Sequence, residues 1–191
     1  MVMTEDLSGH FPGRGKTIWR DWYTHEEVQQ HTDGSPVELD APLGHINVHI
    51  RGGSVILLRS RPGYTIQDTR KSPFKLLVSL SGDENATGWA NLDDGVSVPL
   101  ADNARPSGSR TELSFEAGSG RLTSKVQGGF KIEQKLEEIV VLGVRRKPTK
   151  VTILRRALNK NDWSFDQAKS KLAITIRGGI NLNAVIAVTW E

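Results

Sequence analysis

The stretch that decides the fold is Leu39–Leu58, LDAPLGHINVHIRGGSVILL. Within it, His45–Arg51 alternates polar and apolar side chains, a period of two that is typical of a β-strand with one buried face. A Gly-Gly pair separates this strand from a second apolar run, Val55–Ser60. The polar side of the first strand is either solvated or a binding surface. The side chains on the opposite side of this strand, Ile46, Val48 and Ile50, are predicted to face the core.

Short apolar or aromatic runs of the same kind occur along the rest of the chain, separated by glycine, proline and Asn/Asp clusters. Short strands at such spacing, with turns between them, are typical of a sandwich or a barrel. We therefore predict an all-β fold made of one or two packed antiparallel β-sandwich or jelly-roll-like domains. The remaining predicted strands are Thr17–Tyr23, Phe74–Ser81, Thr87–Leu92, Glu112–Ala117, Arg121–Gln127, Ile139–Val144, Lys150–Leu154, Leu172–Arg177 and Val185–Trp190, and short helices are predicted at His25–Gln30 and Asp166–Lys169.

A polar segment near the middle of the chain, Asp102–Arg110, contains proline, glycine and serine and has the composition of a linker or long loop. It divides the chain into two parts of similar size. We predict a proximal-type sandwich in residues 9–100 and a distal-type sandwich in residues 110–191, and the two can also form one compact unit.

The composition excludes several classes of function. The 191 residues carry a formal net charge of +3 and include no arginine-rich arm, so no nucleic-acid partner is predicted. No apolar stretch is long enough to span a bilayer, and no membrane partner is predicted. The chain has no cysteine, which excludes disulfides, thiolate nucleophiles and cysteine metal sites. Because the N-terminus also lacks the pattern of a signal peptide, we expect a cytoplasmic protein, or a secreted one if the chain is a piece of a longer protein.

Two motifs look like chemical sites but have the wrong spacing. Gly9–Thr17 ends in Gly-Lys-Thr, yet five residues rather than four separate Gly9 from Gly15, and no strand is predicted before it. We therefore interpret it as a turn that leads into a strand, not as a nucleotide-binding loop. His25 and His31 are six residues apart, whereas the zinc-binding helix motif needs a spacing of four. No metal site and no cofactor are predicted.

A family pattern runs through most of the chain. The segments FPGRGKTIWRDWYT, APLGHINVHIRGGS, ATGWANLDDGVSV and VVLGVRRKPTKVTI follow one another as they do in the C-terminal region of the family 31 glycoside hydrolases, especially the fungal α-glucosidases. The chain resembles that region over residues 11–154, and more weakly as far as Trp190. The resemblance implies two β-sandwich domains, proximal and distal, that follow a catalytic (β/α)8 barrel.

The resemblance also implies that this stretch is not catalytic by itself. In the family, the nucleophile and the acid/base are aspartates of the barrel, upstream of the residues present here. Glycoside hydrolysis needs two carboxyl groups that flank one bond. Asp93 and Asp94 are sequence neighbours, and in the family this pair belongs to a structural turn. No α-glucosidase activity is therefore expected from these residues alone.

The chain departs from the family at Gly88–Ser97, GWANLDDGVS, where the usual pattern is GxLYxDDGES. Leucine is replaced by Ala90, tyrosine by Asn91 and glutamate by Val96. Trp89 and Asn91 lie one strand repeat apart on one face, an arrangement that can form the wall of a ligand pocket. The alternative is that Trp89 caps the edge of a sandwich and Asn91 faces water.

The pocket interpretation predicts a site drawn from three strands. Asn91 would donate a hydrogen bond, and His49 and Arg51 would polarise a carbonyl group. This grouping assumes that the strand carrying His49 lies next to the strand carrying Trp89. The predicted ligand-binding residues are Trp89, Ala90 and Trp19, and the predicted catalytic residues are His49, Arg51 and Asn91.

Three functions remain open on the sequence. The first is a stand-alone, non-hydrolytic relative of the α-glucosidase C-terminal sandwich that binds a small molecule, a hydrophobic metabolite or a sugar, in a pocket lined by aromatic and amide side chains. The second is a recruited fungal secondary-metabolism enzyme, a cyclase, a pericyclase of the Diels–Alder type or an isomerase, that orients its substrate without metal or nucleophile. The third is a carbohydrate-binding or structural module of a longer glucosidase.

Overall fold

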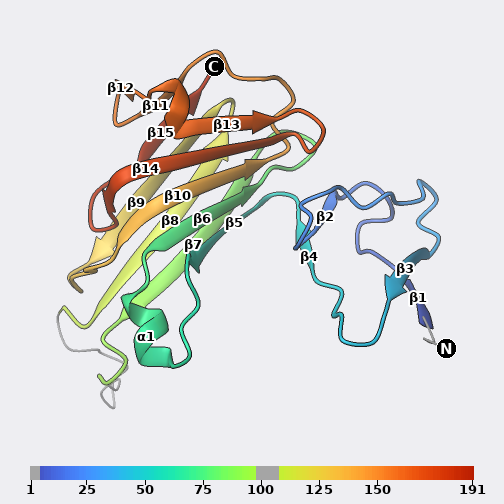
Figure 1. The fold of residues 1–191 in the computed structure, drawn as a ribbon, viewed down its shortest axis with the longest axis horizontal. Helices are drawn as coiled ribbons and strands as arrows, with labels where there is room; N and C mark the ends of the chain where they lie inside the picture. The colour runs from blue at the N-terminus through green and yellow to red at the C-terminus, as the bar shows by residue number, and fades with distance from the viewer. Residues whose placement is uncertain (1–4, 98–107) are drawn as a thin grey trace.

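The structure is a computed structural model that describes residues 5–97 and 108–191 (Figure 1). In this part of the chain the strands form one eleven-stranded sheet and two two-stranded sheets, which confirms the predicted all-β fold. The large sheet contains β5 (Ser54–Arg59), β6 (Phe74–Ser79), β7 (Ala86–Asp93), β8 (Arg110–Gly118), β9 (Arg121–Gly128), β10 (Lys135–Leu142), β11 (Val151–Ile153), β12 (Arg156–Ala157), β13 (Trp163–Asp166), β14 (Lys171–Asn181) and β15 (Ala187–Trp190). The small sheets pair β1 (Glu5–Gly9) with β3 (Val37–Ala41), and β2 (Trp19–Asp21) with β4 (His49–Arg51).

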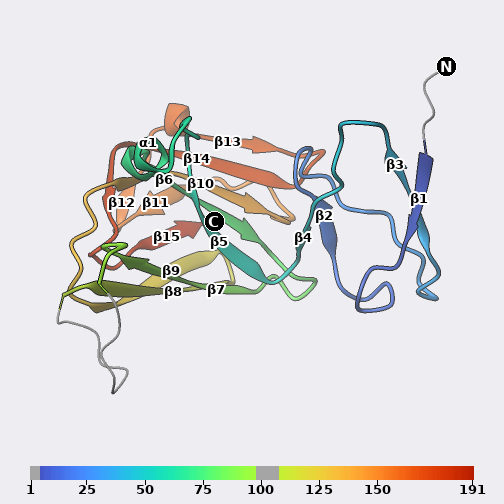
Figure 2. The ribbon, with the colours of Figure 1, turned by 90° about the horizontal axis from the view of Figure 1, so that it is seen from below.

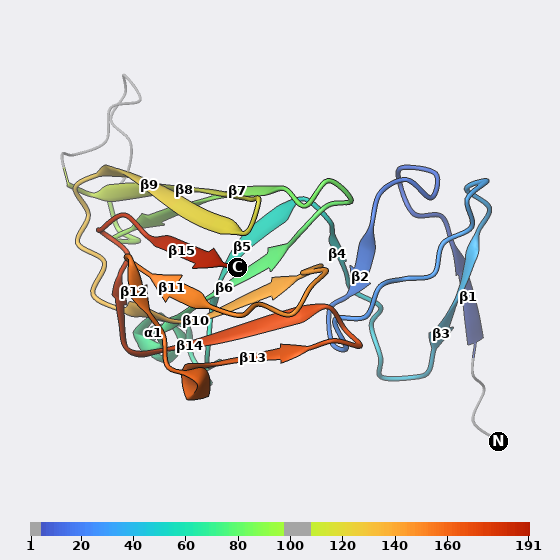
Figure 3. The ribbon, with the colours of Figure 1, turned by 90° about the horizontal axis from the view of Figure 1, so that it is seen from above.

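The large sheet curls into a sandwich. Its strand order is β12-β11-β15-β9-β8-β7-β5-β6-β10-β14-β13. In the two turned views, β7, β8 and β9 form one wall, and β6, β10, β14 and β13 form the other (Figure 2; Figure 3). Most neighbouring strands are antiparallel, as predicted, but β6 runs parallel to β10 and β5 runs parallel to β7.

The main core lies between these two walls. On β8, alternate side chains point inward, and Leu113 and Phe115 are almost fully buried. From the opposite wall, Ile139 of β10 and Ile174 of β14 join the same cluster. Burying one such side chain stabilises the fold by about 1.5–3 kcal/mol. The period-two pattern of these strands therefore supplies the apolar faces that the two walls bury against each other.

Residues 5–52, called the arm from here on, extend to one side of the large sheet (Figure 1). The arm contains both two-stranded sheets. Ile50 of β4 packs with buried residues of β6 and β10 in a small second cluster on the outer side of the sheet. Arg20 of β2 reaches the end of β6 through hydrogen bonds. The arm is thus fastened to the sheet at one place, where β2 and β4 meet it.

Each predicted strand has a counterpart with shifted ends, but both predicted helices are wrong. The backbone around Glu27 pairs with β2 instead of turning into a helix, and Asp166 ends β13 just before a turn. The structure has a different short helix, α1 (Ile66–Lys71), which begins after the N-cap Thr65. Within residues 5–97 and 108–191, no helix has the length and apolarity that crossing a bilayer requires.

The predicted linker lies mostly at residues outside the described ranges, so the division between residues 9–100 and 110–191 stays a prediction. On its two sides, β7 and β8 pair along their whole length, from Ala86 opposite Ala117 to Asp93 opposite Arg110. Strands from before and after the segment therefore belong to one sheet.

Candidate functional site

The β2–β4 ladder positions three of the predicted site residues. Trp19 lies opposite Arg51, and Asp21 lies opposite His49, so these four side chains share one face of the ladder. The ring of Phe11 lies against this face, with its centroid 5.6 Å from that of Trp19 and 4.8 Å from that of His49. The structure therefore brings Trp19, His49 and Arg51 together in the arm.

Asp21 organises the turn that follows β2. Its carboxylate accepts hydrogen bonds from the backbone N–H groups of Tyr23 at 2.8 Å and Thr24 at 2.6 Å. Burial raises the pKa of the Asp21 carboxyl, but these hydrogen bonds outweigh burial, and the pKa lies below its ordinary value. Burial lowers the pKa of His49, and the charge of Asp21 only partly opposes it, which favours the neutral form of the imidazole.

β7 places the other predicted residues in a different part of the molecule. Trp89 and Asn91 point to the outer face and are exposed, which confirms the face they were predicted to share. Ala90 points inward and packs against the main core. β7 pairs with β8 and β5, whereas β4 pairs with β2, so the assumption that the strand of His49 lies next to that of Trp89 is wrong. Which strands lie side by side depends on contacts between distant segments, and the alternation within one strand does not predict it.

The Asp93–Asp94 pair forms the turn that the family resemblance implies. Asp93 accepts a hydrogen bond from the N–H of Gly95 at 3.0 Å, and Asp94 accepts from the N–H groups of Val96 at 3.0 Å and Ser97 at 2.9 Å. Gly95 has a φ of 73°, the left-handed conformation that such a turn needs. These carboxylates shape a loop after β7, at the edge of a hollow of about 630 Å³ that Asn91 and Arg70 also line.

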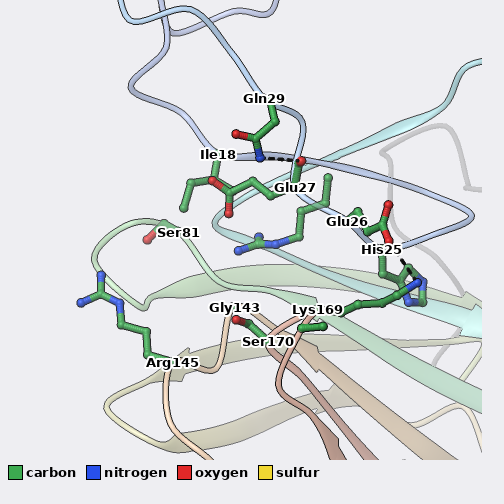
Figure 4. Close-up of a pocket in the computed structure, with 12 residues that line it drawn as sticks. Ile18, His25, Glu26, Glu27, Gln29, Ser81, Gly143, Arg145, Lys169 and Ser170 are labelled. Carbon is green, nitrogen blue, oxygen red and sulfur yellow. Dashed lines mark hydrogen bonds and ion pairs between the residues drawn. The ribbon is translucent and has the colours of Figure 1, made fainter. Parts of the chain in front are cut away.

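A cleft of about 500 Å³ lies where the arm meets the large sheet (Figure 4). Arg20, Glu26 and Glu27 line it from the arm, and Arg145 and Lys169 line it from the sheet. Pockets for hydrophobic metabolites are lined mainly by apolar and aromatic side chains. The charged lining of this cleft does not match that pattern.

Two cationic side chains join the arm to the large sheet at the cleft. The guanidinium of Arg20 is buried and donates to Ser79 Oγ at 2.7 Å and to the carbonyl of Leu80 at 2.9 Å. The ammonium of Lys169 donates to a backbone carbonyl of the arm at 3.0 Å and lies 3.5 Å from the carboxylate of Glu26. A buried charge needs such partners, because an unpaired one would be strongly destabilising. The cleft is therefore a structural junction.

A second hollow, of about 540 Å³, lies within the arm. His45, His49 and Asp21 are among the residues that line it, and the ring of His45 lies 5.2 Å from that of Tyr23. Among the described residues, no group of three or more His, Cys, Asp or Glu side chains is placed to hold a metal ion.

The arm exposes apolar side chains that its sequence pattern assigns to a core. Ile50 is 3% exposed, as predicted, but Ile46 is 75% exposed and Val48 is 37% exposed. The prediction of burial is therefore wrong for the last two, which lie in the segment before β4 begins at His49, whereas Ile50 lies within β4 and packs against β6 and β10. Leu43 is 99% exposed and Tyr23 is 55% exposed. We call Tyr23, Leu43, Ile46 and Val48 the arm surface.

The sequence is similar to those of several fungal carbohydrate-active enzymes. It is 37% identical over 188 residues to an α-glucosidase of Schizosaccharomyces pombe, a match that covers 98% of this chain and 18% of the relative. It is also 31% identical over 192 residues to an uncharacterized family 31 glucosidase of the same yeast, again covering 98% of this chain and 18% of the relative. The chain belongs to family 31 of the glycoside hydrolases.

The match places the chain in the C-terminal β-sandwich region of that family, apart from the catalytic barrel. The chain spans about a fifth of the length of the relatives it matches. No model of a protein family matches it. The fold resembles the catalytic subunit in the ER glucosidase II heterodimeric complex, with a TM-score of 0.73 and 20% identity over 99% of this chain and 21% of that chain. It also resembles the α-1,4-glucan lyase of Gracilariopsis lemaneiformis, with a TM-score of 0.64 and 16% identity over 99% of this chain and 21% of that chain.

Proposed function

We propose that this stretch is a non-catalytic β-sandwich module that packs against the catalytic (β/α)8 barrel of a family 31 glucosidase and stabilises it. The observation that carries the proposal is the arm surface. Leu43 and Ile46 are 99% and 75% exposed, although the alternation around Ile46 is that of a half-buried strand. Contiguous exposed apolar side chains mark contact sites or aggregation liabilities. A surface whose sequence pattern predicts burial, but which is exposed in the described structure, is expected to contact a partner.

The length of the relatives supports the identity of that partner. The match covers only 18% of the S. pombe α-glucosidase, so most of that protein lies outside it. In the family the barrel precedes this region, so the arm is the part of the chain that follows the barrel most directly in the sequence. A barrel that covered the arm surface would bury apolar area at about 25 cal/mol per Å². That gain would stabilise both partners.

The geometry gives less support to a small-molecule enzyme. The six predicted site residues fall into two groups on separate sheets, and the cleft between arm and sheet is lined by charged side chains. Catalysis by orientation alone needs groups that converge on one bound substrate. A module that packs against a barrel does not need these six residues to converge on one substrate.

A chimera tests the proposal. The C-terminal segment of the S. pombe α-glucosidase that matches this chain is replaced by residues 1–191, and hydrolysis of an α-glucoside and thermal unfolding are measured. We expect a folded, active chimera. Leu43→Lys combined with Ile46→Lys should lower its melting temperature by several degrees, because the barrel would then bury two charges. The matched control is Val185→Lys, which changes an exposed apolar residue in the segment between β14 and β15, outside the arm.

The isolated chain supplies the second measurement. Because Leu43 and Ile46 are exposed there, the double variant should leave its melting temperature unchanged. An unfolded or inactive chimera would contradict the proposal. So would a double variant that behaves like Val185→Lys in the chimera.

A further inference from the structure

The outer face of β7, β8 and β9 differs from the arm surface in having one aromatic ring among polar groups. Trp89 of β7 is 71% exposed. Ser114 of β8 lies opposite Trp89, and Lys125 of β9 lies opposite Ser114. One repeat along β7, Asn91 lies opposite Glu112. We call this surface the Trp89 face; its members are Trp89, Asn91, Glu112, Ser114, Lys125 and Gln127.

The Trp89 face is open. In the view from above, β7, β8 and β9 form one wall of the sandwich, and the arm lies beyond one end of it (Figure 3). Among the described residues, no ring contact or hydrogen bond involves the indole of Trp89. Neighbouring strands lie about 4.8 Å apart, and successive outward residues of one strand lie about 6.6 Å apart. The indole is therefore flanked by polar groups at fixed spacings close to the width of one sugar ring.

The charges on this wall cancel in pairs. Lys125 Nζ lies 3.3 Å from Glu116, and Arg110 Nη2 lies 3.3 Å from Glu112. Exposed pairs of this kind contribute little stability. They also leave no excess of positive charge that would attract a nucleic acid or an anionic membrane. What remains for recognition is an uncovered indole beside hydroxyl and amide groups.

We propose that the Trp89 face binds the neutral hexopyranose rings of a linear glucan. The indole is a flat surface that is apolar on its faces and polar at its N–H, so it suits the C–H side of a sugar ring. Asn91 and Ser114 are placed to hydrogen-bond with the ring hydroxyls. A purely apolar ligand would leave these polar groups unpaired. In this site Trp89 keeps the ligand-binding role that the sequence predicts, and Asn91 binds rather than catalyses.

The proposal is independent of the packing of the arm against a barrel, because the arm contributes no residue to the Trp89 face. An open surface with one stacking ring predicts weak binding, with a dissociation constant of about 1 mM. Repeated sugar rings along a glucan would raise the apparent affinity by offering several equivalent positions to the Trp89 face.

Titration of the isotope-labelled chain with maltoheptaose, cellohexaose and laminarihexaose, followed by NMR, tests the proposal and separates the linkages. We expect at least one of these sugars to shift the indole N–H of Trp89 and the backbone amides of the Trp89 face. Trp89→Ala should weaken binding at least about tenfold, and Asn91→Ala about threefold. The matched control is Tyr64→Ala, which removes a fully exposed aromatic ring from the loop before α1 and should leave binding unchanged.

Two results would overturn the proposal. One is the absence of shifts with all three sugars at about ten times the expected dissociation constant. The other is unchanged affinity in Trp89→Ala. If Trp89→Ala proves less stable than the parent chain, Trp89→Phe, which keeps a ring, is the variant to compare. The Ile46→Lys variant should bind sugar normally, so the proposal of glucan binding and the proposal of barrel packing can be contradicted independently.

Discussion

The arm and the large sheet are both built from short strands, yet they bury very different amounts of surface. Among the arm side chains that the structure describes, only Arg20 and Ile50 are buried. In the large sheet the inward positions of β8 and β10 are buried almost without exception. A two-stranded ladder is at best marginal by itself, whereas a curled sheet covers its own apolar face. The difference shows that an alternating pattern specifies which side needs cover, and that the cover comes from elsewhere.

The largest expected effect contrasts two isoleucines of the same chemistry. Ile174 of β14 is fully buried, and Ile46 of the arm is 75% exposed. Ile174→Ala should lower the free energy of unfolding by about 2–5 kcal/mol, because it opens a cavity. Ile46→Ala should change it by less than about 0.5 kcal/mol. Urea unfolding followed by circular dichroism measures both values, and equal losses would mean that the arm surface is buried in the free chain.

A smaller effect concerns the buried cation that joins the two regions. Arg20→Met removes the hydrogen bonds to Ser79 Oγ and to the carbonyl of Leu80, at a cost of about 1–3 kcal/mol. Because the large sheet does not contain Arg20, the loss should release the arm and leave the sheet folded. Limited proteolysis with mass spectrometry should then show faster cleavage within residues 5–52 than within the sheet.

The control for this prediction is Arg51→Met, which removes an exposed arginine from the same small ladder. Its cleavage pattern should match that of the parent chain. A global loss of resistance in Arg20→Met, with the sheet cut as fast as the arm, would show that Arg20 supports the whole fold.

Much of the fold could be predicted because strand patterns are local. The strands β1 and β3 of the arm are not predicted, because their sequences, EDLSG and VELDA, are polar and the two strands pair only with each other. The helix α1 was missed although its sequence carries a start signal: Thr65 accepts a hydrogen bond from the N–H of Asp68 at 3.1 Å, and the two side chains also contact each other at 2.7 Å. That signal could have been found.

The site could be predicted only in part. The period of two placed Trp89 and Asn91 on one face, because that relation holds within a single strand. It could not place His49 relative to Trp89, because the pairing of β4 with β2 and of β7 with β8 depends on contacts between distant segments. Nor could it show that Ile46 lacks a cover, since burial depends on what lies opposite the strand.

The smallest expected effect depends on pH and again separates the arm from the sheet. His25 lines the cleft between them. Burial lowers its pKa, the positive charges of Lys171, Lys75 and Lys169 lower it further, and Asp21 opposes them. In the unfolded chain a histidine titrates near 6.5, so between that value and the lower folded pKa the unfolded state binds more protons. The contribution of His25 to stability is therefore full above about pH 6.5 and is lost as the pH falls through the folded pKa.

Because His49 also has a lowered pKa and lies in the arm, acid should weaken the arm before the sheet. Hydrogen exchange at pH 7.5 and pH 5.5, corrected for intrinsic rates, should show a larger loss of protection in β2 and β4 than in β8. His25→Asn is the variant to compare, because asparagine tolerates the positive φ of 62° at this position and does not titrate. It should reduce the difference, and adding His49→Gln should reduce it further. Equal loss of protection in β8 and in the arm would mean that the seam between the two regions is not where protonation acts.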